Sequence, residues 1–132
     1  MAASTTYDVQ GLINPDWPDH HVNSLYADSF WLPRIGPSAM CLLRWISHQP
    51  DHQANASLPD LSEALGLSGG RQSTRTIERS LQRLAHNGLG RRTPTRIELS
   101  LTVPSLTTRQ IAALDPATRA LHNRLHSEPS HT

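Results

Sequence analysis

Residues 60–88, DLSEALGLSGGRQSTRTIERSLQRLAHNG, decide the fold expected for this chain. Asp60 can cap the start of a helix, with Glu63 three residues later as in a capping box, and Gly66 can supply the left-handed residue that ends it. A second, longer helix is expected over about 73–87, where another glycine stops it. The stretch therefore predicts a short helix, a glycine turn and a longer helix.

The second predicted helix has two contrasting faces. Its arginines recur every fourth residue and, at roughly 100° per residue, drift across a face roughly 120° wide. This cationic face holds Arg71, Arg75, Arg79 and Arg83, with Gln72, Thr76, Ser80 and Gln82 among or beside them. The opposite, apolar side holds Ile77, Leu81, Leu84 and Ala85. A solvated polar surface gives the same pattern, so the helix alone leaves a binding role open.

Positive charge is concentrated around this helix. The chain has twelve arginines and no lysine, and the stretch from Arg71 to Arg96 holds seven of the arginines and one acid, Glu78. The local excess is therefore +6, seven positive charges against one negative, in a chain whose formal net charge is +1. The first thirty-three residues instead carry four aspartates and no arginine. This asymmetry favours a polyanionic partner.

The sequence resembles the winged helix-turn-helix transcription regulators. The resemblance rests on residues 61–68, LSEALGLS, and 77–89, IERSLQRLAHNGL, and extends over about residues 37–101. In that family the second helix enters the major groove of DNA, and a basic β-hairpin called the wing follows it. Here residues 90–101 form two strand-like runs around a Thr-Pro-Thr turn, which matches the position of the wing.

The resemblance implies sequence-specific binding of double-stranded DNA by a transcription regulator. The second helix would read bases, and the wing would hold the backbone or enter the minor groove. The residues assigned to DNA in this way are Arg71, Gln72, Arg75, Thr76, Arg79, Ser80, Arg83, Arg91, Arg92 and Arg96. The turn from Gly66 to Gln72 is longer than is common in the family and includes Gly69-Gly70, so the base-facing residues stay open. The lysine-free composition and the entry WLPRIGPS, residues 31–38, also resemble small actinobacterial proteins of this class.

The rest of the chain is expected to complete one domain of mainly α structure with a small β-hairpin and extra helical segments at both ends. Residues 1–23 are expected to be an irregular arm in which Trp17 alone docks on the domain. Residues 24–127 would be the winged helix-turn-helix domain with its flanking helices, and residues 128–132 a frayed tail.

Further elements are expected on either side of the helix-turn-helix stretch. An aromatic segment, Leu25–Leu32, would lie against the domain, and a broadly apolar helix would begin at Pro37 and bury Cys41. Residues 56–58 could form the small strand that pairs with the wing in this fold, and Ala117–His126 a final helix.

Other function classes find little support in the sequence. No apolar run is long enough to cross a bilayer and the N-terminus does not resemble a signal peptide, which predicts a cytoplasmic, nucleoid-associated protein. The chain has no glycine-rich phosphate loop after a strand and no nucleophile elbow, so neither catalysis nor a cofactor is expected. His122 and His126 lie one helical turn apart, yet a zinc site usually needs three or four ligands, so solvated histidines and no metal are expected.

Two questions about partners stay open at this stage. Winged helices also serve as protein docking modules without DNA, in which case Leu25–Leu32 or the final helix would carry the function. The same segments could instead form a homodimer surface, because one short recognition helix covers few base pairs, or they could close over the core of a monomer. A row of arginines followed by a basic hairpin favours DNA over docking.

Overall fold

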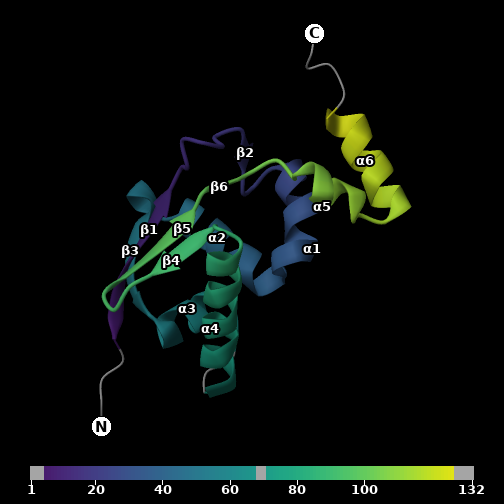
Figure 1. Cartoon of the computed structure of the whole chain (residues 1–132). Coiled ribbons are helices and arrows are strands. Elements are labelled where there is room, and N and C mark those ends of the chain that lie inside the picture. Colours follow the sequence, from purple (N-terminus) through teal and green to yellow (C-terminus); the bar gives the residue numbers. More distant parts are fainter. Residues whose placement is uncertain (1–4, 68–70, 127–132) are drawn as a thin grey trace.

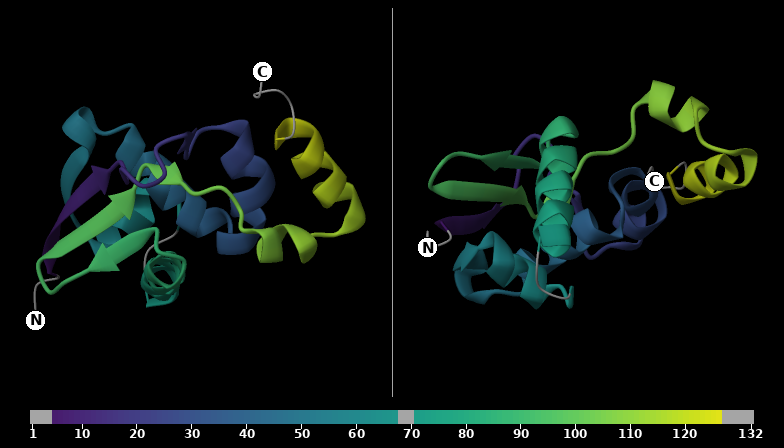
Figure 2. Two further views of the ribbon diagram at one scale, coloured as in Figure 1. Left: turned by 45° about the horizontal axis from the view of Figure 1, so that its top comes forward. Right: turned by 90° about the horizontal axis from the view of Figure 1, so that it is seen from below.

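The computed structural model describes residues 5–67 and 71–126 of the 132-residue chain. It shows a small α/β protein with a mixed sheet at one end, the last two helices at the other, and helix α4 (Arg71–His86) between them (Figures 1 and 2). The expected Gly69-Gly70 turn and the expected tail at residues 128–132 lie outside the described residues. None of the described helices is long and apolar enough to span a membrane.

The main sheet has four strands in the order β3, β1, β5 and β4. They span Gln53–Ser57 (β3), Thr6–Leu12 (β1), Arg96–Ser100 (β5) and Gly90–Arg92 (β4). Strand β1 pairs antiparallel with β3 and parallel with β5, so it is an inner strand. Tyr7 and Val9 are buried, whereas Asp8 and Gln10 are partly exposed on the opposite face. This alternation is that of a strand with one covered face.

Strand β1 corrects two predictions about the N-terminal half. Residues 1–23 are not simply an irregular arm, because part of that stretch lies inside the sheet; its polar alternate residues face the open side and concealed the strand. The strand expected at residues 56–58 exists as the end of β3, but it does not pair with the hairpin: Ala56 lies opposite Tyr7 of β1. Trp17 is partly buried against the core, as expected. The protein is therefore richer in β structure than the predicted mainly α fold.

Helices α2 (Pro37–Ser47), α3 (Leu58–Ala64) and α4 pack together and onto the sheet. Helix α2 begins at Pro37 as predicted and is the central core helix, with Leu42, Leu43 and Ile46 fully buried. Cys41 is exposed, which corrects the prediction of a buried thiol. It lies on the outer side of α2, between buried residues that point inward.

Helix α3 begins earlier than predicted and has a different cap. Ser57 is the N-cap, and its hydroxyl accepts a hydrogen bond from the Asp60 backbone N–H while the Asp60 carboxylate accepts one from the Ser57 N–H. Asp60 is thus the acidic partner in the capping box, three residues after the cap, whereas the sequence analysis had Asp60 as the cap and Glu63 as its partner. The Ser57 backbone N–H, and to a smaller extent its side chain, lowers the pKa of Asp60. Gly66 has a φ of 77° and ends the helix in the left-handed conformation, as predicted.

The remaining elements lie mostly away from the main sheet, except for the 3₁₀ turn at residues 50–52, which precedes β3 and contacts β1. They are strand β2 (His20–His21), which pairs with β6 (Thr102–Val103), a π-helical turn (Ala27–Trp31), α1 (Leu32–Ile35), a 3₁₀ turn (Pro50–His52), α5 (Thr108–Ala112) and α6 (Pro116–His126). Helix α6 matches the predicted final helix. It follows α5 at the far right of Figure 1.

The aromatic segment is covered within the chain. Tyr26, Phe30 and Trp31 are buried, with 6%, 1% and 2% of their surface exposed. His122 of α6 packs against the Phe30 ring, and its Nε2 lies 3.0 Å from the Tyr26 hydroxyl. His122 is therefore a buried residue and not the solvated histidine that was predicted. Because these side chains close over the core, they are not an exposed surface for a second molecule; Leu25 alone among the large apolar residues of this segment is exposed.

Candidate nucleic-acid interface

Helix α4 separates its buried and exposed residues as the sequence predicted. Ile77 and Leu84 are fully buried and Leu81 is 6% exposed, so these residues fix the helix to the core. The opposite side is exposed and holds Gln72, Arg75, Arg79, Gln82, Arg83 and His86. His86 was not predicted, although its spacing of three and seven residues from Arg83 and Arg79 places it on the same face. Ala85 is exposed and does not belong to the apolar side.

Two hydroxyl side chains of α4 are turned back onto the helix. The Ser80 hydroxyl donates to the Thr76 carbonyl at 2.8 Å, and the Thr76 hydroxyl donates to the Gln72 carbonyl at 3.1 Å. Ser80 is only 6% exposed, so it is wrongly placed among the DNA-facing residues. Thr76 is partly exposed at the edge of the arginine face.

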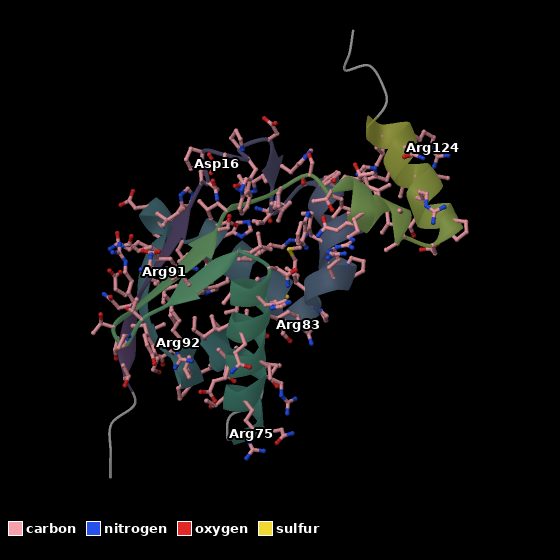
Figure 3. The ribbon with its side chains drawn as sticks, in the orientation of Figure 1. Asp16, Arg75, Arg83, Arg91, Arg92 and Arg124 are labelled. Carbon is pink, nitrogen blue, oxygen red and sulfur yellow. The ribbon has the colours of Figure 1, made fainter. Side chains whose placement is uncertain are left out.

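The arginines of α4 differ in how they are held. Arg75 and Arg79 are exposed and make no ion pair or hydrogen bond with the described residues. Arg83 donates from Nη1 to the Ile35 carbonyl at 3.2 Å, which ties α4 to the junction between α1 and α2. Figure 3 shows Arg75 at the lower end of α4 and Arg83 farther along, on the side toward α1. The side chain of Arg71 lies outside the described residues.

The arginines of the β4–β5 hairpin point to both faces of the sheet. Arg92 lies on the helix side, where it donates to the Tyr7 hydroxyl at 2.7 Å, stacks over the Tyr7 ring at 5.1 Å and approaches Glu78 of α4 at 3.9 Å. Arg91 is exposed and lies opposite Glu98 on the outer face. Figure 3 shows both arginines over the strands, away from Arg75 and Arg83.

Arg96 is held on the outer face of the sheet by acceptors from two strands. Its guanidinium donates to the Gln10 side-chain carbonyl, and its Nε lies 3.5 Å from the Glu98 carboxylate and 4.0 Å from that of Asp8. Asp8 and Gln10 reach it because β1 runs parallel to β5 with Asp8 opposite Arg96. Sequence reasoning missed these contacts because it placed the N-terminal segment outside the sheet.

The arginine set predicted from sequence therefore divides in two. Arg75, Arg79 and Arg83 share one exposed helix face, whereas Arg92 and Arg96 already have acceptors inside the protein and Arg91 lies on a different surface. The arrangement can bind an extended polyanion along α4. Within residues 5–67 and 71–126, no three histidine, cysteine or acidic side chains are grouped so as to hold a metal ion.

Comparisons with known proteins identify no relative of this chain: no family model, no curated protein and no solved structure matches it.

Proposed function

We propose that the chain is a winged helix-turn-helix protein that binds double-stranded DNA in a sequence-specific manner and regulates transcription. The order of α2, β3, α3, α4, β4 and β5 supports this proposal, because a core helix, a short strand, two helices and a hairpin follow one another as in that family. The insertion of β1 between β3 and β5 departs from the expected pairing of the small strand with the wing.

The observation that carries the proposal is the exposed face of α4. Arg75 and Arg79 lie one turn apart on it with glutamines on either side, and the acid at its edge, Glu78, approaches Arg92 of the hairpin. Arginine can donate two parallel hydrogen bonds to guanine, and glutamine can pair with adenine, so this face offers groups suited to base edges in the major groove. Arg83 and Arg91 would contact phosphates.

A docking module without DNA is less well supported. The aromatic rings that would carry docking are buried, and the final helix uses His122 and Leu121 within the chain, although Leu25 and Leu125 of these two segments are exposed. The arginine face of α4 has no comparable role inside the protein, since Arg75 and Arg79 are exposed. Binding of DNA therefore gives a role to the arginine face of α4, whereas docking through the aromatic segment or the final helix does not.

The proposal is tested by measuring the affinity of the purified protein for duplex DNA as a function of salt. If about four to six phosphates are neutralised, the logarithm of the association constant should fall with the logarithm of salt concentration with a slope near −4 to −5. Selection from random duplexes should then enrich a defined sequence. A folded protein that fails to bind any duplex at low salt would contradict the proposal.

A further inference from the structure

A shallow pocket of about 140 Å³ opens beside the arginine face, between the first turn of α2 and the middle of α4. Gly36 and Ser38 line it from the start of α2, and Thr76, Arg79 and Arg83 line it from α4. Its volume corresponds to about four to five water molecules, which is room for a phosphate group but not for a nucleoside.

One of the two arginines that flank the pocket, Arg83, is held in place by the α1–α2 junction. The Arg83 guanidinium donates to the Ile35 carbonyl and passes close to Gly36, where an added Cβ would lie 2.7 Å from Nη1. Gly36 also has a φ of 87°, a backbone conformation that favours glycine, and a side chain there would displace the Arg83 guanidinium. The positive charge at this pocket is thus fixed by the fold and not only by a flexible surface side chain.

The electrostatics of the pocket favour an anion. Arg79 and Arg83 lie one turn apart on its α4 side, and the first turn of α2 contains no acidic residue. Backbone N–H groups in the first turn of a helix have no acceptor within the helix, so they add donors and a partial positive charge to those of the arginines. The Ser38 hydroxyl can donate as well.

We propose that this pocket holds one backbone phosphate of the bound DNA, an inference that rests on the function proposed above. The phosphate accepts hydrogen bonds from the Arg83 guanidinium and from the first turn of α2, and Arg79 adds positive charge beside it. The Arg75 end of α4 is then directed into the major groove, while the Arg83 end is fixed on the backbone. The pocket supplies an anchor on the side of α4 away from the hairpin, where Arg92 and Arg96 are already engaged.

The test places a negative charge in the pocket without a mutation in α4. Ser38→Glu adds an acid at the second position of α2, where it interacts favourably with the helix dipole and should preserve folding. Ala117→Glu is the matched control, because Ala117 is exposed and also follows a proline at the start of an 11-residue helix, α6, far from α4. Both variants change the net charge by the same amount.

Ser38→Glu is expected to weaken duplex binding about tenfold or more and to reduce the magnitude of the salt slope by about 1. Ala117→Glu should change affinity by less than about threefold, because its charge is screened beyond the Debye length. Circular dichroism and thermal unfolding of both variants check that α2 and the rest of the fold are intact.

A second measurement uses duplexes in which single phosphates are replaced by neutral methylphosphonates. One position should weaken binding of the unaltered protein and have little effect on Ser38→Glu, which identifies the phosphate that the pocket holds. This coupling is read from the DNA side, so it remains informative if Ser38→Glu is somewhat less stable.

Two results would overturn the inference while leaving DNA binding intact: equal affinities of Ser38→Glu and Ala117→Glu for duplex, or no methylphosphonate position whose effect depends on Ser38. Ser38-dependent binding of inorganic phosphate with unchanged duplex binding would also overturn it, since the pocket would then hold a free anion. Failure of the unaltered protein to bind duplex at low salt would instead contradict the proposed function itself.

Discussion

Helix α4 and the β4–β5 hairpin each carry three arginines whose side chains the structure describes, and the two sets have different surroundings. On α4, Arg75 and Arg79 extend into solvent and Arg83 makes one hydrogen bond to a backbone carbonyl. On the hairpin, Arg92 and Arg96 are surrounded by a tyrosine, a glutamine and three carboxylates. The number of arginines in a segment therefore does not indicate how many are available to a polyanion. Availability depends on which acceptors the fold brings next to each guanidinium.

The difference between the arginines of α4 and those of the hairpin is tested most directly at the exposed end of α4. Arg75→Ala and Arg79→Ala should each reduce affinity for a selected DNA site by roughly 1–3 kcal/mol and reduce the preference for that site over unrelated duplex. Neither substitution should change the free energy of unfolding by more than about 0.5 kcal/mol, because both side chains are exposed.

Fluorescence anisotropy with selected and unrelated duplexes measures both effects. Arg124→Ala is a suitable control, since Arg124 is exposed on α6 at the far end of the molecule (Figure 3). If both helix variants keep full discrimination, the base-reading face of the protein has been assigned wrongly.

The hairpin should respond in the opposite way. Arg92→Gln removes the hydrogen bond and the ring contact to Tyr7, so the free energy of unfolding should fall by about 1–2 kcal/mol while DNA affinity changes by less than about threefold. Urea denaturation and anisotropy report the two quantities separately. A large loss of affinity with unchanged stability would place Arg92 on DNA and remove the contrast with α4.

Tyr7→Phe sharpens the same comparison with a smaller change. It keeps the ring beneath Arg92 and deletes the hydroxyl that accepts its hydrogen bond, which should cost about 0.5–1.5 kcal/mol of stability. In a double-mutant cycle with Arg92→Gln, the two effects should be less than additive. Strict additivity in urea denaturation would mean that the two side chains do not interact.

The capping box of α3 gives the smallest expected effect, a pH-dependent change in the stability of the protein. The pKa of Asp60 is lowered from its ordinary value of 3.8, so its carboxylate stabilises the fold fully at pH values above 3.8. This contribution is lost as the pH falls through the lowered pKa. Asp60→Asn should therefore destabilise the protein at neutral pH, and the difference should vanish in acid. Glu63→Gln, which removes one negative charge from the same helix outside the capping box, is the control. Thermal unfolding of the unaltered protein and both variants across pH measures the difference.

The helical region was predictable because its signals are local. The positions of Ile77, Leu81 and Leu84 follow from the helical period alone, and Gly66 acts as a turn residue wherever it stands. The sheet was not predictable in this way. Strand β1 is half polar, and only its pairing with β3 and β5, both far along the chain, makes it a strand.

In the candidate site, too, features set by local sequence were predictable and features set by distant contacts were not. Exposure of Arg75 and Arg79 follows from their place on α4, which the sequence indicates. The contacts of Arg96 depend on β1, and the pocket at Ser38 depends on how α2 crosses α4, so neither is visible in a local pattern. Ser80 was misplaced although it lies three residues after Ile77 and four before Leu84, at the edge of the buried side, where its hydroxyl donates to the Thr76 carbonyl.

The position of β1 also bears on how the protein is made. Tyr7 and Arg92 are 85 residues apart in sequence, yet they touch across the sheet, and β1 pairs on one side with β5, which is synthesised long after it. On a ribosome, β1 emerges early and has no parallel neighbour until β5 follows it, whereas the helices can form from nearby residues. Completion of the sheet therefore awaits the hairpin, and until then the Tyr7 and Val9 side chains of β1 lack much of their cover. This leaves the apolar face of β1 open to mispairing, and folding should be slower than the helical content alone suggests.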